Sequence, residues 1–189
     1  MILGRKSPPG EEPYYFGKVD GVDKKFRRVI AGVILPVFDR QEAAVCVIAE
    51  TFSISKPQEF TVIDAYVGVW PEVERAMLQY DKNYQFRDAI VPTKAERMLL
   101  WRIPWSAHIL TWQAPDWSLT AVGHQKVDQL FKENRLHAEV LEAASAGDSL
   151  DIGSKALDVA VNYALDWNPP YITKTPKPVE WTPIGAKGL

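Results

Sequence analysis

Three long apolar runs follow one another between residues 26 and 69, and they constrain the fold more than any other feature of the chain. They cover residues 26–38, 43–54 and 60–69 and are rich in Val and Ile, which favour strands. Turn-like residues, among them Pro36 and Pro57, separate them. Because connections this short join antiparallel neighbours, the sequence predicts a three-stranded antiparallel meander.

From residue 70 onward the hydrophobic period changes from two residues to about 3.6, which is typical of helices. A helix is expected over residues 71–82, where Pro71 stands at a first helical position. Residues 86–91 are a strand candidate. Thr93 and Glu96 then have the spacing of a capping box, which predicts the start of a second helix.

The remaining elements also alternate. Residues 108–112 predict one more strand, and a long helical region should run to about residue 146 with a bend near Asn134. Ser154 can cap a last helix, in which Leu157 and Val161 share an apolar stripe. Helices and strands therefore alternate after the meander.

With 189 residues and 47% hydrophobic residues, the chain has the size and composition of one ordinary domain. Residues 1–13 are expected to be an extended N-terminal segment, residues 14–167 a single globular domain, and residues 168–189 a proline-rich extended tail. Cys46 lies inside an apolar run and is expected in the core.

Charge and hydropathy exclude little. A net charge of -2 gives no overall attraction to nucleic acid. No stretch of the sequence approaches the roughly 18 apolar residues of a membrane span, and no secretory signal begins the chain. A cytoplasmic protein without a membrane partner is therefore expected.

The order of elements predicts an α+β fold with a ribonuclease H-like mixed sheet, three antiparallel strands being followed by alternating helices and strands. Residues 30–33, Asp39 and Arg40, residues 62–64 and Trp70 resemble the nuclease domain of phage large terminase subunits. Residues 155–158 and 163–165 are similar to the closing helix of that family.

This resemblance implies a nuclease of phage origin that acts on nucleic acid with Mg²⁺ or Mn²⁺ held between carboxylates. The candidate catalytic residues are Asp39, Asp64, Asp88 and Asp158, with Asp64 and Asp158 as metal ligands. The sequence departs from the family in its first strand, where residues 33–35 carry no acid. A degenerate relative that binds without metal chemistry therefore remains open.

Each acid also has a structural interpretation. Asp39 suits a turn, and Asp64 can alternate to the solvent face of its strand. Asp158, Asn162 and Asp166 are four residues apart and could form a solvated ridge. The three His residues show no zinc-ligand spacing, and no Gly-rich phosphate loop is present in the sequence.

Two further groups could bind partners. Lys24, Lys25, Arg27 and Arg28 could contact DNA phosphates, or could be ordinary edge-strand charges. Tryptophans 101, 105, 112 and 117 could stack bases, or could fill the core or a self-interface. A second hypothesis follows: a non-catalytic interaction module, in which the Trp-rich segment and the proline-rich tail bind a partner protein or form a homo-oligomer.

Overall fold

The computed structural model describes residues 2–6, 14–19, 22–36, 42–51, 57–84, 88–105, 107–111, 124–140 and 150–166. The strands are β1 (Ile2–Lys6), β2 (Tyr14–Val19), β3 (Val22–Ile34), β4 (Glu42–Thr51), β5 (Phe60–Val69), β6 (Asp88–Val91), β7 (His108–Thr111) and β8 (Leu136–His137). The described helices are α1 (Trp70–Tyr84), α2 (Lys94–Leu100), α3 (His124–Lys132) and α5 (Leu150–Asp166).

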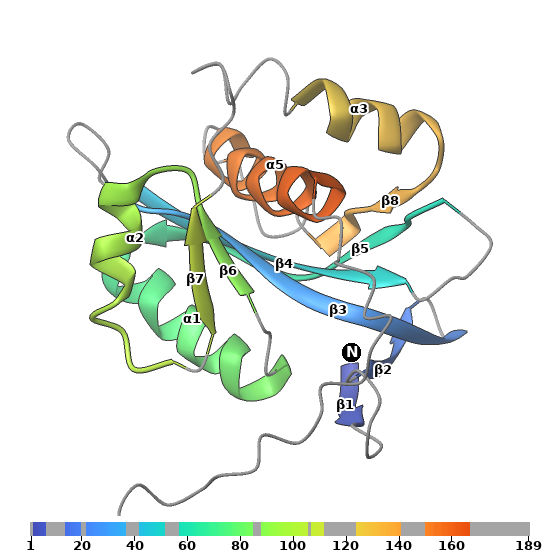
Figure 1. Ribbon diagram of the computed structural model, residues 1–189, viewed down its shortest axis with the longest axis horizontal. Helices are drawn as coiled ribbons and strands as arrows, with labels where there is room; N and C mark the ends of the chain where they lie inside the picture. Colours follow the sequence, from blue (N-terminus) through green and yellow to red (C-terminus); the bar gives the residue numbers. More distant parts are fainter. Residues whose placement is uncertain are drawn as a thin grey trace, which may run out of the picture.

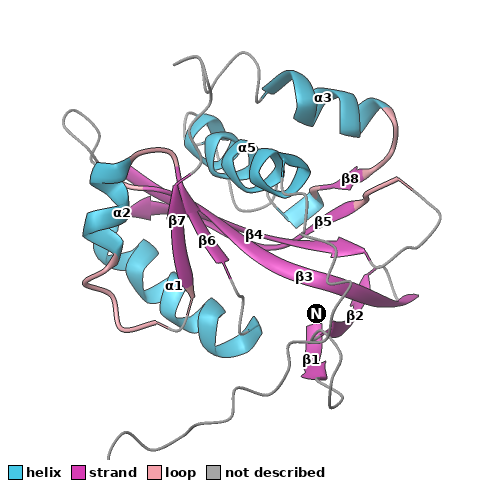
Figure 2. Ribbon diagram, in the orientation of Figure 1, coloured by secondary structure: helices cyan, strands magenta, loops and turns pink. Residues whose placement is uncertain are grey.

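All eight strands belong to one mixed sheet, shown in Figure 2. The strands β3, β4 and β5 form the antiparallel meander, and β6 then returns beside β3 in parallel, followed by β7 in parallel to β6. The five central strands therefore lie in the order β5-β4-β3-β6-β7. This order resembles the ribonuclease H-like topology, and the predicted α+β fold class is confirmed.

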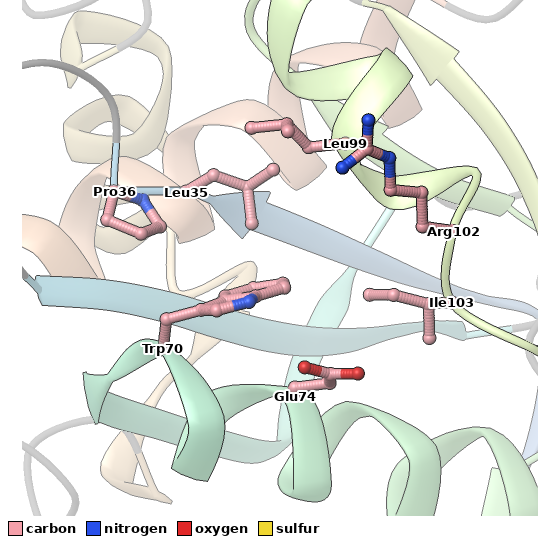
Figure 3. A pocket seen from close by; sticks show the side chains of 7 residues that line it. All are labelled: Leu35, Pro36, Trp70, Glu74, Leu99, Arg102 and Ile103. Atoms are coloured by element: carbon pink, nitrogen blue, oxygen red, sulfur yellow. The ribbon is translucent and has the colours of Figure 1, made fainter.

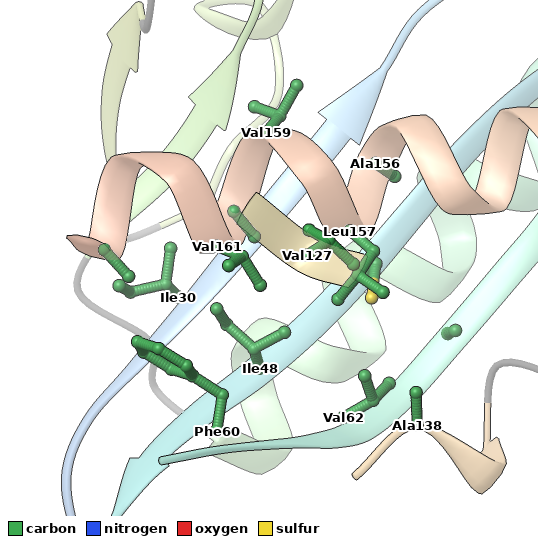
Figure 4. Packing of buried hydrophobic residues seen from close by; sticks show 14 of the residues in the cluster. Ile30, Ile48, Phe60, Val62, Val127, Ala138, Ala156, Leu157, Val159 and Val161 are labelled. Atoms are coloured by element: carbon green, nitrogen blue, oxygen red, sulfur yellow. The ribbon is translucent and has the colours of Figure 1, made fainter. Parts of the chain in front are cut away.

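Helices cover both faces of this sheet (Figure 1). The helices α3 and α5 pack on one face, where the core includes Ile30, Ile48 and Phe60 from the strands and Val161 from α5, as Figure 4 shows. The helices α1 and α2 pack on the other face, with Phe26, Met77 and Leu100 in its core. Cys46 is fully buried, which confirms its predicted place in the core.

Helix α5 lies closer to β3 at Gly32 than any side chain at that position would allow. A Cβ atom added at Gly32 would lie 2.0 Å from the carbonyl oxygen of Ala156 and 2.9 Å from the Cβ of Ala160. Real Cβ contacts are not this short, so only glycine fits at this point of the strand. The helix backbone therefore lies directly on the middle of β3.

The helical region predicted to run to about residue 146 is interrupted near Asn134, where a bend was expected; residues 139–140 are helical again, and residues 141–149 lie outside the described part of the chain. Helix α3 stops at Lys132, and Asn134 adopts a positive φ of 54°, which short polar residues such as Asn tolerate. The amide of Arg135 donates to the carbonyl of Leu130 and closes the helix end. Residues 136–137 then pair in parallel with β5 as β8.

The N-terminal residues 2–6 take part in the sheet, because β1 pairs with β2 in antiparallel fashion. Asp39 and the proline-rich residues 168–189 lie outside the described residues. Among the described helices, none is long and apolar enough to cross a membrane.

Candidate functional site

The predicted catalytic acids lie on different faces of the sheet. Asp158 belongs to α5, and Asp88 begins β6, where its Oδ2 accepts a hydrogen bond of 3.4 Å from the hydroxyl of Tyr163 on α5. Asp64 instead interacts with α1 on the opposite face. Asp39 is outside the described residues, so three of the four predicted acids can be placed: Asp88 and Asp158 lie on the α5 side, Asp64 bonds to α1, and the charges of both Asp64 and Asp158 act on the buried Cys46 between them.

Asp64 accepts a hydrogen bond from a tyrosine of α1. The hydroxyl of Tyr84 donates to Asp64 Oδ2 at 2.9 Å. The pairing of β4 with β5 is irregular at Asp64, because Val47 opposes Asp64 while Ile48 opposes Val62. Burial raises the pKa of the Tyr84 hydroxyl, and the neighbouring charge of Asp64 raises it further. This tyrosine therefore remains a neutral donor, and Asp64 anchors α1 to an irregular point of the sheet.

Asp158 and Asn162 do not form the solvated ridge that their spacing suggested. Both are buried, with exposed fractions of 4% and 0%, because α5 lies between the sheet and other parts of the chain that include α3. The side-chain nitrogen of Asn162 donates to the carbonyl of Asp158 at 2.8 Å. His124, at the start of α3, places its Nδ1 3.7 Å from Asp158 Oδ2. Asp158 therefore links the two helices.

The described residues do not by themselves form the metal centre that the nuclease resemblance implies. Among them, no three His, Cys, Asp or Glu side chains are grouped so that they could hold a metal ion. The nuclease family carries an acid in its first strand, but the α5-facing side of β3 presents Ile30, Gly32 and Ile34. At Gly32 the contact with α5 leaves no room for any side chain.

The residues of the predicted basic cluster, Lys24, Lys25, Arg27 and Arg28, have different partners. Arg28 is buried, forms an ion pair with Glu50, and donates to the carbonyl of Ala164 in the last turn of α5 at 2.6 Å. Burial lowers the pKa of the Arg28 guanidinium, and the charge of Glu50 opposes that shift. Gln58 donates to the same carboxylate at 3.1 Å. Arg28 is therefore committed to the interior of the protein.

Lys24 is also engaged, although it lies nearer the surface. Its Nζ lies 3.2 Å from Glu59 Oε1, and His137 Nε2 lies 3.2 Å from the same oxygen. Partial burial opposes ionisation of Glu59, but the hydrogen bonds and charges of Lys24 and His137 outweigh it, so the pKa of Glu59 is lowered. This network joins β3 to β8. Lys25 and Arg27 are half-buried and make interactions of their own.

An apolar surface lies on α2 and the residue that follows it. Met98, Leu99 and Trp101 are 65%, 42% and 61% exposed, and we call these three residues the α2 surface. The guanidinium carbon of Arg97 lies 5.1 Å from the centroid of the Trp101 ring, so a cation-π contact orients the indole. The core interpretation of Trp101 was therefore wrong. Trp105 is half-buried against the core of this face.

A pocket of about 370 Å³ opens beside the α2 surface (Figure 3). Leu35 and Pro36, at the end of β3, line it together with Trp70 and Glu74 of α1 and with Leu99, Arg102 and Ile103 at the end of α2. The side chains of these residues converge on an apolar interior, and Glu74 and Arg102 contribute one charge of each sign. No local sequence pattern predicts this pocket, because its walls come from three separate segments.

Comparisons with protein-family models, with characterised proteins and with solved structures find no match. The function must therefore be inferred from the chain's own geometry. Two features of the structure could bind a partner: the α2 surface and the pocket beside it.

Proposed function

We propose that this protein is a non-catalytic protein-interaction and self-association module, built on a ribonuclease H-like sheet, and that the α2 surface is its contact site. The observation that carries the proposal is the exposure of Met98, Leu99 and Trp101 within four consecutive residues. Contiguous exposed apolar side chains mark interaction sites, and Trp and Met are enriched at the centres of interfaces.

The α2 surface is preorganised. Thr93 caps α2, and the Glu96 side chain completes the capping box by accepting from the Thr93 amide at 3.1 Å. Glu96 is buried and also accepts from the amide of Leu35 at 3.3 Å, which ties α2 to the end of β3. Leu100 anchors the helix in the core. A rigid surface loses little conformational entropy on binding, which favours affinity.

The α2 surface also has arginines beside its apolar side chains. Arg97 stacks on Trp101 and Arg102 follows directly in the sequence, so the apolar side chains are bordered by cations. Arg and Trp are the residues whose truncation most often costs binding energy. We therefore expect Trp101 to be the side chain on which association depends most.

Self-association gives the direct test. We expect the purified chain to form a concentration-dependent dimer in sedimentation velocity, and Trp101→Ala to raise its dissociation constant about 30-fold, as loss of a central interface residue does. Phe131→Ala is the matched control, because Phe131 is a 44% exposed aromatic residue on α3, which covers the other face. A chain that stays monomeric, or an equal effect of both substitutions, would contradict the proposal.

A metal-dependent nuclease of phage origin is the second candidate. The ribonuclease H-like topology favours it, together with Asp88 and Asp158, which are both buried on the α5 side of the sheet. The test is plasmid nicking with Mg²⁺ or Mn²⁺. Nicking that Asp158→Asn or Asp64→Asn abolishes would support DNA cleavage, and intact plasmid at every metal concentration would contradict it.

A further inference from the structure

We propose that Trp101 of one copy of this chain enters the pocket beside the α2 surface of a second copy, in a two-fold pair whose axis lies near Met98. This inference rests on the proposed function, self-association through the α2 surface, and names the site that its central side chain occupies. The exposed indole and the pocket both belong to the described residues. Three observations support the contact: the positions of its two parts on α2, their apolar character and their charges.

Trp101 points away from the pocket of its own chain. Successive residues of an α-helix are about 100° apart around its axis, and Trp101 keeps helical dihedral angles, a φ of -61° and a ψ of -15°. Relative to Met98, Trp101 therefore leaves the helix about 60° to one side and Leu99 about 100° to the other. Leu99 lines the pocket and Trp101 does not. A second copy is therefore needed to bring the indole and the pocket together.

A two-fold axis brings two such contacts together at once. When the axis passes near Met98 and runs along α2, the side of one copy that carries Trp101 faces the side of the other copy that carries Leu99 and the pocket. Each contact of such an interface occurs twice, and the pair closes without free ends. The Met98 side chains, which are 65% exposed in the single chain, then meet at the axis. A closed dimer is therefore the expected product.

The pocket suits an indole. Its volume of about 370 Å³ lies within the roughly 300–1,000 Å³ of pockets that bind small organic molecules. Leu35 and Ile103 are buried and Trp70 is half-buried, and Figure 3 shows their side chains around the apolar interior. An aromatic side chain that fills a pocket of its partner is typical of the residues that dominate binding energy. Trp101, which is 61% exposed, gains such burial in the pair.

The charges set the orientation of the indole in the pocket. Arg97 lies 5.1 Å from the ring centroid of Trp101, so its guanidinium accompanies the indole. Glu74 and Arg102 line opposite sides of the pocket in Figure 3. Glu74 of the second copy attracts Arg97 and Arg102 repels it, so Arg97 is expected on the Glu74 side. Among the described residues, no ion pair engages Glu74 or Arg97, so both charges are available to a partner.

Photo-crosslinking between two copies tests the contact. The full chain with Trp101→p-benzoylphenylalanine is mixed with ¹⁵N-labelled, unsubstituted chain and irradiated. We expect position 101 to crosslink mainly to ¹⁵N-labelled peptides that contain Leu35 or Trp70. Phe131→p-benzoylphenylalanine, on α3, is the control and should not reach these peptides. Crosslinks that join position 101 only to its own chain, or only to α2 of the labelled copy, would overturn the inference.

Charge exchange gives a second test. Glu74→Arg and Arg97→Glu each bring like charges together at both contacts of a homodimer, so each variant alone should dimerise at least about tenfold more weakly. In an equal mixture of the two variants, both contacts join opposite charges. The mixture should therefore associate at least about tenfold more tightly than either variant alone in sedimentation velocity. A mixture that associates no more tightly than the separate variants would contradict the contact between Arg97 and Glu74.

The outcomes separate this inference from the proposed function. A dimer that Trp101→Ala weakens, but whose crosslinks avoid the pocket, would keep the α2 surface as the contact site and overturn the entry of Trp101 into the pocket. A chain that stays monomeric at every concentration would overturn both.

Discussion

The helices cover the two faces of the sheet in different ways. On the α5 face, a long helix lies directly on β3 at Gly32, and the polar groups beside it, Arg28 and Glu50, satisfy each other inside the protein. On the other face, α1 and α2 cover the strands, but the outer side of α2 presents Met98 and Trp101 to solvent. The α5 face is closely packed at Gly32 and exposes Phe131 on α3, whereas α2 on the other face exposes three apolar side chains within four consecutive residues.

This difference separates stability from recognition. Buried side chains on the α5 face have partners in the same molecule, so their substitution should mainly change the free energy of unfolding. Side chains on the α2 surface have few such partners, so their substitution should mainly change association. The expected effects below run from the largest to the smallest.

Breaking the buried ion pair should have the largest effect. Arg28→Met leaves the Glu50 carboxylate buried without its guanidinium, and we expect the free energy of unfolding to fall by about 3–5 kcal/mol. Urea denaturation measures it. The double variant Arg28→Met with Glu50→Leu removes both charges and should recover most of the loss. A single variant that costs less than about 1 kcal/mol would show that α5 does not depend on this pair.

A methyl group at the contact between β3 and α5 should come next. Gly32→Ala forces the helix backbone away from the strand, and we expect a loss of about 1–3 kcal/mol. Gly68→Ala is the matched control, because its Cβ would meet only the Glu72 and Tyr66 side chains, at 3.1 Å. Equal losses in urea denaturation would mean that the α5 face is not closely packed.

The tyrosine contact on the α1 face should matter less. Tyr84→Phe removes the donor to Asp64 and keeps the ring, so the expected loss is about 1 kcal/mol, the net value of one hydrogen bond. Thermal or urea unfolding measures this loss. An effect as large as that of Arg28→Met would erase the contrast between the two faces.

The smallest change in stability should come from the α2 surface. Met98→Gln replaces a 65% exposed side chain, and exposed substitutions usually change the free energy of unfolding by less than about 0.5 kcal/mol. The same variant should weaken the dimer in sedimentation velocity. A large loss of stability would show that Met98 belongs to the core rather than to an interaction surface.

Local signals in the sequence were sufficient for much of the fold. The meander follows from apolar runs and turns, and the start of α2 follows from Thr93 and Glu96, whose capping box the structure confirms. These features depend on neighbours within a few residues. The order of elements then predicted a mixed sheet, because few arrangements satisfy the connection rules, and the parallel pairing of β6 with β3 agrees with it.

The candidate site was harder to predict, because its contacts join distant residues. Arg28 meets Ala164 across 136 positions, and no local pattern marks it as buried. Asp158 and Asn162 stand at the spacing of an exposed ridge, but packing on both sides of α5 buries them. Trp101 was expected to stack bases or to fill the core or a self-interface, and no local pattern could show that it is 61% exposed.

The late position of α5 in the sequence has a consequence for synthesis. Its partners on β3, such as Ile30 and Gly32, leave the ribosome more than a hundred residues before Leu157 and Ala160. Until then, the nascent sheet lacks the helix that lies on β3, and exposed apolar surface of this kind promotes aggregation. Slow translation of the segment before α5 should therefore increase the demand for chaperones.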